Sequence, residues 1–320
     1  FSGLRALEDL YAGNNEISTV TGLADCNVLE TLNLSGNRLT DIDISVVPTV
    51  TGLYLYNNEL TSLDLSGNPD IAWMNVSDNH IGALDLSKLT NLRLLHANNN
   101  EIAELDLSNV PYCSQLTVGN NRLSALDLSK QTALYWLKAD GNNLTALDLS
   151  NNTYLSLLEC GRNKLTTLDL SKNTMLRRLA AEENMLTSLD IAANHDLCGI
   201  SLQGNAMEAA AINAMIAQLI DVTDQKPLEG SEWITMLDIS SMPGTTGADI
   251  AAAQAKGWNV TAGGGSRIDD IDIDSADVVA VSYYTLSGMA LGNEAPSAGC
   301  YIARITLADG RTVARKYFLR

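Results

Sequence analysis

Aspartate is the residue best placed to do chemistry in this sequence, because it recurs at a fixed interval. Eight aspartates stand in Leu-Asp-Leu-Ser or a close variant of it, each 21 residues after the last. Stacked carboxylates repel one another, yet carboxylate oxygens are also what Ca²⁺ prefers. We favour ordinary hydrogen bonding to the backbone and to nearby Ser and Thr hydroxyls, with a weak calcium strip as the alternative. The eight residues are Asp43, Asp64, Asp85, Asp106, Asp127, Asp148, Asp169 and Asp190.

A second acidic run, DDIDIDSAD, has only a superficial likeness to a calcium loop. Asp270, Asp272 and Asp274 have the first three spacings of such a loop. The loop then requires Gly where Ser275 stands and Glu where Val281 stands. The alternation with isoleucine fits a strand or an acidic linker better.

Histidine and cysteine give no pattern of a metal or catalytic centre. His80, His96 and His195 fall at unrelated positions, and no Cys-x-x-Cys occurs. Serine and aspartate are abundant, but no histidine singles out one pair of them. We therefore expect no catalytic residue, no metal site and no cofactor, and a chain that is not an enzyme.

A repeat carries these residues through the first two thirds of the chain. Nine units of 21 residues follow one of 22 that begins at Leu7, with the consensus L-x-x-L-x-L-x-x-N-x-L-T-x-L-D-L-S plus four variable residues. Position 1 of the later units is Leu29, Val50, Ile71, Leu92, Cys113, Leu134, Leu155, Leu176 and Leu197. Position 9 is asparagine in all ten units: Asn15, Asn37, Asn58, Asn79, Asn100, Asn121, Asn142, Asn163, Asn184 and Asn205.

This consensus resembles the leucine-rich repeat family, in which each repeat contributes a short strand to a horseshoe-shaped solenoid. The resemblance covers residues 7 to about 207, and the L-T-x-L-D-L-S half is similar to a subgroup found in surface and secreted proteins of Bacteroidetes bacteria. It implies a right-handed parallel β superhelix of the α/β class. It also implies a binding module at the outer cell surface or in the extracellular space.

The physics of the repeat leads to the same architecture. Positions 4 and 6 are apolar and alternate with positions 3, 5 and 7, which predicts a strand with one buried face. One strand cannot close a core, so coils must stack. The position 9 asparagine falls where the strand turns, and its amide can pair with buried turn backbone. Positions 13–17 alternate again, which predicts a short strand or tight turn on the opposite wall.

Two of the five cysteines occupy positions of the repeat that are otherwise apolar. Cys113 and Cys160 occupy apolar positions 1 and 6 of the repeat, so we expect both to be buried. Cys26, Cys198 and Cys300 lie in distant segments, and we expect free thiols.

The candidate binding site comes from positions 3, 5 and 7, which we call the outward positions. Aromatic and apolar side chains gather at the outward positions of a few neighbouring coils, where a rigid ring can bury much area at low entropy cost. We predict one spot from three successive coils and a second about 15 Å further along the stack. The alternative is a cross-strand ladder of rings that only stabilises the sheet. The candidate residues are Tyr54, Tyr56, Trp73, Leu94, His96, Trp136 and Leu157.

The repeat fails after Asn205, and the pattern that follows predicts a cap. The order of elements that it predicts is helix–strand–helix–strand. Helical spacing predicts a helix over 208–220, and alternation predicts a strand from Trp233 to Ile239. A capping box at Thr246 to Asp249 begins a second helix that runs to about Gly257, and a strand over 258–261 follows. The N-terminal end has no comparable cap, so we expect the native chain to begin further upstream.

The C-terminal segment, from Val278 onward, does not follow the repeat pattern. Residues 302–307 and 312–318 flank an Asp309-Gly310 turn and predict a hairpin. The ending SAGCYIARITLADGRTVARKYFLR resembles the C-terminal sorting domain of type IX export in Bacteroidetes, and Asp274-Ser275-Ala276 is similar to their short O-glycosylation pattern. We expect four parts: a ten-unit solenoid (1–207), an α/β cap (208–261), a Gly-rich and acidic linker (262–277) and a small β-domain (278–320).

Composition limits the partners. The 320 residues hold 20 Lys and Arg against 38 Asp and Glu, a net charge of −18, which disfavours nucleic acid and anionic membranes. No apolar run is long enough to span a bilayer. We expect a monomer that presents a concave face to a protein or glycan. The alternatives are a structural spacer or stalk without a specific ligand and an accessory domain of a larger secreted enzyme.

Overall fold

The computed structural model describes residues 1–223 and 235–262 in full, and the backbone of four strands between 278 and 319. Two sheets are present: a parallel sheet of twelve strands and an antiparallel sheet of four. The linker, the calcium-like run and the glycosylation-like triplet predicted from the sequence lie outside the described residues.

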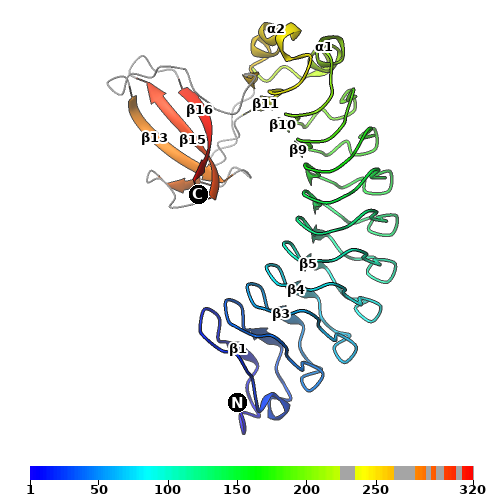
Figure 1. Ribbon diagram of the computed structural model, residues 1–320, viewed down its shortest axis with the longest axis vertical. Coiled ribbons are helices and arrows are strands. Elements are labelled where there is room, and N and C mark those ends of the chain that lie inside the picture. The colour runs from blue at the N-terminus through cyan, green and yellow to red at the C-terminus, as the bar shows by residue number, and fades with distance from the viewer. Residues whose placement is uncertain (224–234, 263–277, 286–289, 293–298, 308–311, 320) are drawn as a thin grey trace.

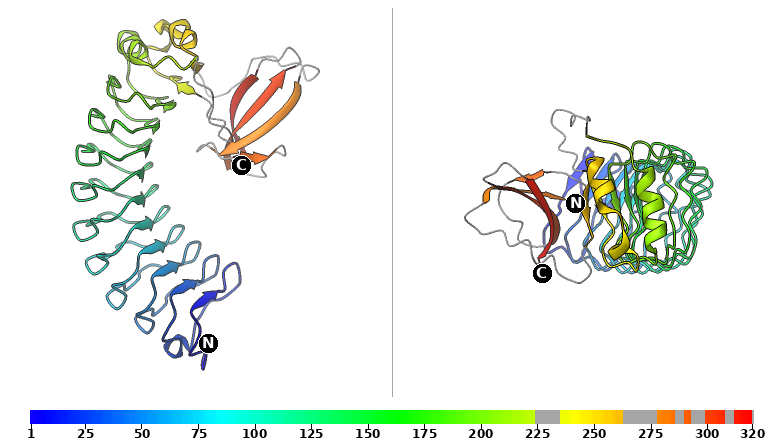
Figure 2. Two further views of the ribbon diagram at one scale, coloured as in Figure 1. Left: turned by 180° about the vertical axis from the view of Figure 1, so that it is seen from behind. Right: turned by 90° about the horizontal axis from the view of Figure 1, so that it is seen from above.

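The parallel sheet follows chain order without a crossover, so each coil adds one strand beside the last (Figure 1). Figures 1 and 2 show the coils stacked into an arc, with all strands on its inner side and irregular turns on its outer side. The strands are β1 (Asp9–Tyr11), β2 (Thr31–Asn33), β3 (Gly52–Tyr54), β4 (Trp73–Asn75), β5 (Leu94–His96), β6 (Gln115–Thr117), β7 (Trp136–Lys138), β8 (Leu157–Glu159), β9 (Arg178–Ala180), β10 (Gly199–Ser201), β11 (Met236–Asp238) and β12 (Asn259–Thr261).

The solenoid has two more turns than the ten predicted from the repeat. The cap contains helices α1 (Ala209–Gln218) and α2 (Ile250–Ala255), as its helical spacing indicates. Strands β11 and β12 pair in parallel with β10 and with each other, so the cap extends the sheet. The capping box was placed too early, because Thr245–Gly247 forms a 3₁₀ turn, η2, and the Asp249 side chain accepts the Ala252 N–H.

The core is a continuous column of the predicted apolar positions. Leu32, Leu34, Leu53 and Leu55, at positions 4 and 6, are each 0% exposed. Each strand covers only positions 3–5, shorter than the predicted 3–7, although backbone bonds between coils continue past it. Positions 13–16 form neither of the two predicted alternatives, and the turn of the outer wall begins at position 17, as at Ser66 and Gly67. A second 3₁₀ turn, η1 (Leu23–Asp25), lies in the first unit.

The chain leaves each strand through a residue in the left-handed region. Position 8 has φ of 56° at Asn57 and 54° at Asn99, and 64° at Gly141. Asn, Asp and Gly tolerate this region best, and they fill position 8 in most coils. Arg162 and Glu183 adopt it with φ of 52° each, which is less usual for a long side chain.

The position 9 asparagine closes the corner that position 8 opens. The Asn121 amide donates to the carbonyls of Ala97 (2.9 Å) and Val118 (3.0 Å), and its Oδ1 accepts the Ile102 N–H at 3.0 Å. Ala97 and Ile102 belong to the preceding coil, so each asparagine ties two coils together. The same pattern recurs from Asn37 to Asn205, and the predicted pairing with turn backbone is confirmed.

A second row of amides, not singled out from the sequence, stands at position 19. Asn152 donates to the Leu128 and Gln131 carbonyls of the preceding coil, at 3.1 and 2.9 Å. Its Oδ1 is buried without a partner among the described residues. Where position 19 is apolar, as at Leu89, the site is simply part of the core.

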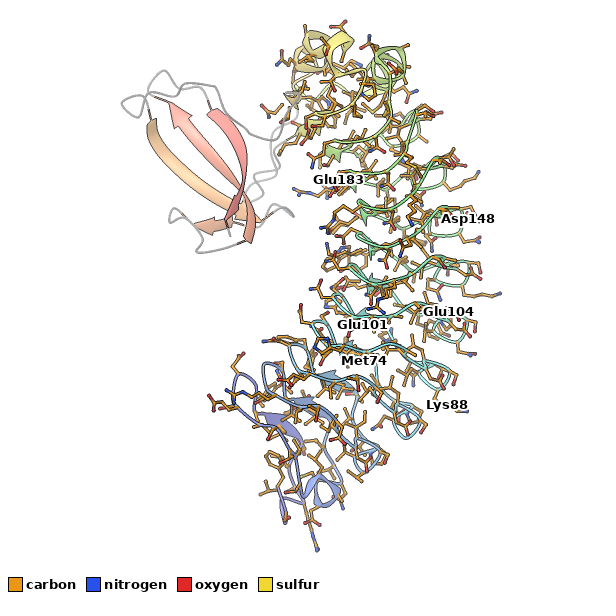
Figure 3. All side chains as sticks on the ribbon, viewed as in Figure 1. Met74, Lys88, Glu101, Glu104, Asp148 and Glu183 are labelled. Atoms are coloured by element: carbon orange, nitrogen blue, oxygen red, sulfur yellow. The ribbon has the colours of Figure 1, made fainter. Side chains whose placement is uncertain are left out.

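The aspartate row lies on the outer wall and is satisfied locally. Each of the eight side chains accepts the N–H of the residue two positions later, as Asp148 does from Ser150 at 2.9 Å. Hydrogen bonds from the Ser150 backbone and side chain lower the pKa of Asp148. Figure 3 places Asp148, Glu104 and Lys88 on this outer wall, opposite the strands. The hydrogen-bonding interpretation is therefore confirmed.

The C-terminal strands are β13 (Val278–Thr285), β14 (Ala290–Gly292), β15 (Gly299–Leu307) and β16 (Thr312–Leu319), in the order β14-β13-β15-β16. Strands β15 and β16 pair in antiparallel register from Gly299–Leu319 to Thr306–Thr312. The predicted hairpin is confirmed, with its strands somewhat longer than expected.

Replacing Asn121 with alanine should leave three carbonyls and one N–H of two coils without their partner. We expect a loss of about 1–3 kcal/mol in the free energy of unfolding, measured from the urea midpoint with a two-state check. Asn15, at the same position of the first coil, is exposed, and Asn15→Ala is the matched control that should change stability much less. A loss below about 0.5 kcal/mol for Asn121→Ala would contradict the corner role.

Candidate functional site

All seven predicted site residues belong to the concave side of the solenoid. Tyr54, Trp73, Leu94, His96, Trp136 and Leu157 lie within strands β3, β4, β5, β7 and β8, and Tyr56 follows β3 by two residues. The register aligns Trp73 with Leu94 and Trp136 with Leu157. Trp73 is 45% exposed and the other six are partly buried.

The two apolar spots predicted from the sequence are not separate. The rings of His96 and Trp136 meet edge to face, with centroids 5.8 Å apart and an interplanar angle of 71°. Strand β6 lies between them, and its Thr117, aligned with His96, is short and 1% exposed. The imidazole therefore reaches across one strand and joins the two spots into one surface.

The alternative of an aromatic ladder finds little support. In residues 1–223 and 235–262, His96 and Trp136 form the one ring–ring contact. The rings of Tyr54, Tyr56 and Trp73 do not stack on one another. Their faces are therefore not used in ring–ring stacking within the sheet.

One aromatic residue of the concave face was left out of the sequence prediction. Tyr11 stands at an outward position of β1 and is 69% exposed. The sequence prediction passed over it because the outward positions of the next coil, Thr31, Asn33 and Ser35, hold no aromatic residue. The position 5 register then runs Tyr11, Asn33, Tyr54, Asn75 and His96 on five adjacent strands.

The two asparagines of this row are held in fixed orientation. Asn33 Oδ1 accepts the Ser35 N–H at 3.1 Å and its hydroxyl at 2.7 Å, and Asn75 Oδ1 accepts the Ser77 N–H at 3.1 Å. Neither amide NH₂ donates to a group in the described part of the chain. Both donors are therefore left for a group outside the sheet.

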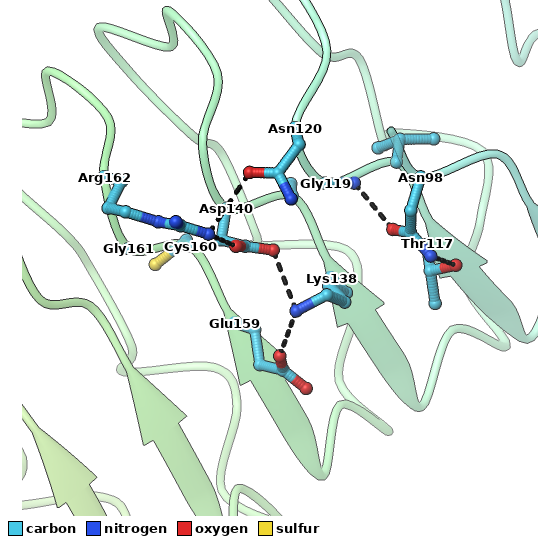
Figure 4. Close-up of polar contacts among 12 residues, drawn as sticks. Asn98, Thr117, Gly119, Asn120, Lys138, Asp140, Glu159, Cys160, Gly161 and Arg162 are labelled. Atoms are coloured by element: carbon cyan, nitrogen blue, oxygen red, sulfur yellow. Dashed lines mark hydrogen bonds and ion pairs between the residues drawn. The ribbon is translucent and has the colours of Figure 1, made fainter. Parts of the chain in front are cut away.

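The next coils carry a charged cluster that pairs with itself (Figure 4). The Lys138 ammonium lies 2.6 Å from Glu159 Oε2 and 2.9 Å from Asp140 Oδ1. Arg162, the long side chain at a left-handed position, pairs with the other Asp140 oxygen and with Asn120. Burial alone would lower the pKa of Lys138, but Glu159 and Asp140 outweigh it and raise that pKa.

His96 occupies a partly dry environment. Burial lowers its pKa, which a hydrogen bond with Gln115 only partly offsets. Its Nε2 and the Trp136 Nε1 are both buried without a hydrogen-bond partner among the described residues. The imidazole is therefore neutral at physiological pH.

Other exposed aromatic residues lie outside the concave face. Tyr112 and Tyr154 are each 60% exposed at position 21, on the side of the coil before the strand. Sequence analysis passed over them because position 21 is variable. They offer natural controls for the aromatic residues of the concave face.

The cysteine predictions hold where the structure tests them. Cys113 and Cys160 are 0% exposed, and desolvation raises the pKa of the Cys113 thiol to about 12. Cys26 and Cys198 are free thiols, whereas the Cys300 side chain lies outside the described residues. In the described part, no group of three His, Cys, Asp or Glu side chains is placed to hold a metal ion.

Known proteins share this architecture. A model of leucine-rich repeats (two copies) matches residues 5–46, and no curated protein matches the chain. The chain is similar to the functional domain of InlJ from Listeria monocytogenes, with 21% identity, a TM-score of 0.67, and coverage of 99% of this chain and 86% of that one. A leucine-rich-repeat protein of Leptospira interrogans has 19% identity and a TM-score of 0.67, covering 81% of this chain and 67% of its own.

The chain has the leucine-rich-repeat fold. An internalin, inlF, of Listeria monocytogenes is a further neighbour with 18% identity and a TM-score of 0.55, covering 80% of this chain and 87% of that one. Leucine-rich-repeat solenoids are typically binding scaffolds, and many of their partners are proteins. In the described segments no helix is long and apolar enough to cross a membrane.

His96 should make stability depend on pH. Because folding lowers its pKa, the folded chain binds fewer protons than the unfolded chain once pH falls below the ordinary value of 6.5. Stability is therefore full above about pH 6.5 and falls as pH drops toward the folded-state pKa. In His96→Gln, the urea midpoint should fall less than in wild type between about pH 7.5 and about pH 5.5. If the urea midpoint of His96→Gln falls as much as that of wild type over this pH range, the prediction is wrong. His195→Gln, which alters an exposed side chain, is the control and should behave like wild type.

Proposed function

We propose that this protein is a non-enzymatic binding module, secreted by a bacterium or held at its outer surface, whose concave face takes up a protein or glycan ligand. The observation that carries the proposal is the set of unstacked aromatic side chains on adjacent strands of a rigid sheet. Exposed rings on a fixed scaffold lose little entropy on binding and dominate many interfaces.

The fold and its neighbours support this function. The leucine-rich-repeat solenoid is typical of protein-binding modules, and internalins of Listeria are among the similar structures. A spacer or stalk has no need of Trp73 at 45% exposure on its concave face. An accessory role in a larger secreted enzyme would use the same face.

We also propose a Bacteroidetes origin and an export role for residues 278–320. The L-T-x-L-D-L-S half-repeat and the ending GCYIARITLADGRTVARKYFLR, which resembles a type IX sorting domain, support this. The antiparallel pairing of β15 with β16 is compatible with a small β-domain of that kind.

Removing two aromatic side chains at once should abolish binding without unfolding the protein. We expect Trp73→Ala with Tyr54→Ala to lose binding on an array of extracellular proteins and glycans that wild type recognises, with the unfolding midpoint nearly unchanged. Both side chains point out of the sheet, so little core packing is lost.

The matched control is Tyr112→Ala with Tyr154→Ala, which removes two rings from the side of the coils. This variant should bind like wild type. If the concave double variant instead unfolds at a sharply lower denaturant concentration and no ligand loses affinity, the rings serve the sheet alone.

A further inference from the structure

The concave face is divided by charge. From β2 to β6, none of the outward positions is Asp, Glu, Lys or Arg, although the chain holds 58 such residues, 20 basic and 38 acidic. Asp9 on β1 and Lys138 on β7 mark the two ends of this uncharged area. His96, within it, has a pKa lowered by burial and is neutral.

The charged cluster next to this area is paired internally. Lys138 is shared between Asp140 and Glu159, and Arg162 also pairs with Asp140, which is 6% exposed. These groups satisfy one another within the sheet. An ion-pairing partner thus finds no unpaired cation in this cluster.

Along the uncharged area and the strand at its edge, β1, the position 5 row alternates ring and amide. Tyr11, Tyr54 and His96 alternate with Asn33 and Asn75 on consecutive strands. Parallel strands lie about 4.8 Å apart, so the rings repeat about every 10 Å and so do the amides. The Tyr54 ring lies over Gly52, where a Cβ would contact its Cε2 at 3.4 Å.

Such a row fits a sugar chain better than a folded protein surface. Aromatic faces stack on the C–H faces of pyranose rings, and oriented amide donors bind their hydroxyls. An extended β-1,4-linked glycan presents equivalent faces once every disaccharide, a length close to two strand spacings. A charged glycan would bring carboxylates or sulfates to a face that holds no counter-charge.

We propose that the row Tyr11–Asn33–Tyr54–Asn75–His96 is a binding surface for an extended, neutral β-1,4-linked glycan that lies along the solenoid. This rests on the proposed function, because it names the ligand class of the concave face. Its orientation follows from the row, which runs across the strands and therefore parallel to the solenoid axis.

The test uses the full chain and four probes in titration calorimetry: cellohexaose, β-1,4-mannohexaose, β-1,4-xylohexaose and, as the charged counterpart with the same linkage, the β-1,4-linked hexamer of mannuronic acid. We expect at least one neutral hexamer to bind and the acidic hexamer to bind more weakly or not at all. Binding by the acidic hexamer alone, or by none of the four, overturns the proposal.

Variants locate the site. Tyr11→Ala should weaken binding of the neutral hexamer by about tenfold or more. Asn33→Asp and Asn75→Asp keep the oxygen that accepts from Ser35 or Ser77 and replace only the free NH₂, so each should weaken binding while the unfolding midpoint stays unchanged. Tyr154→Ala, with similar exposure outside the row, should bind like wild type.

The outcomes separate this proposal from the one on which it rests. If Tyr154→Ala abolishes glycan binding while Tyr11→Ala and Asn75→Asp do not, the site is elsewhere. If no glycan binds but a protein ligand is lost in the Trp73/Tyr54 double variant, the concave face still binds and the ligand class is wrong. If that double variant loses nothing either, both proposals fall.

Discussion

The structure depends on satisfying the backbone polar groups that each coil buries when the chain leaves its strand. One side-chain amide per coil meets this demand, since Asn121 serves carbonyls of its own coil and of the preceding one. The bond across coils fixes the register between neighbouring turns at the corner. The first unit, of 22 residues, keeps the same bonds from Asn37 to Ala12 and Ile17, so its extra residue is taken up away from the corner. Strands of only three residues are sufficient, because the hydrogen bonds at the corners hold each coil in register with the next.

This rigid frame decides what the concave side chains can do. Successive strands offer the same three outward positions at the same spacing. The side chains at one position of successive coils therefore form a row across the sheet. On the outer wall the rows are aspartates, each satisfied inside its own turn, and they carry much of the net negative charge. The inner wall is different: one half is uncharged and aromatic, and the other holds ions that pair among themselves. Charged side chains are thus absent from the outward positions of β2 to β6, where most of the rings and both free amides lie.

Much of this could be predicted from the sequence, because the repeat converts spacing directly into position. The role of Asn121 followed from the amide chemistry and the turn that must exist there. The contact between His96 and Trp136 could not be foreseen, since it depends on how far a side chain leans over a neighbouring strand. Tyr11 was missed because the adjacent coil holds no aromatic residue at its outward positions. Asn152 was missed because its position alternates between polar and apolar residues along the chain.

The parallel register of the concave face also constrains how such a protein can change length. Solenoids gain and lose whole coils readily, since each coil contacts only its neighbours. Here the ring and amide alternate with a period of two coils, whereas the frame repeats with a period of one. Duplicating or deleting a single coil between β1 and β5 would preserve every buried contact, yet it would place ring beside ring or amide beside amide. The fold and the row of rings and amides thus have different symmetries, and only changes by an even number of coils conserve both.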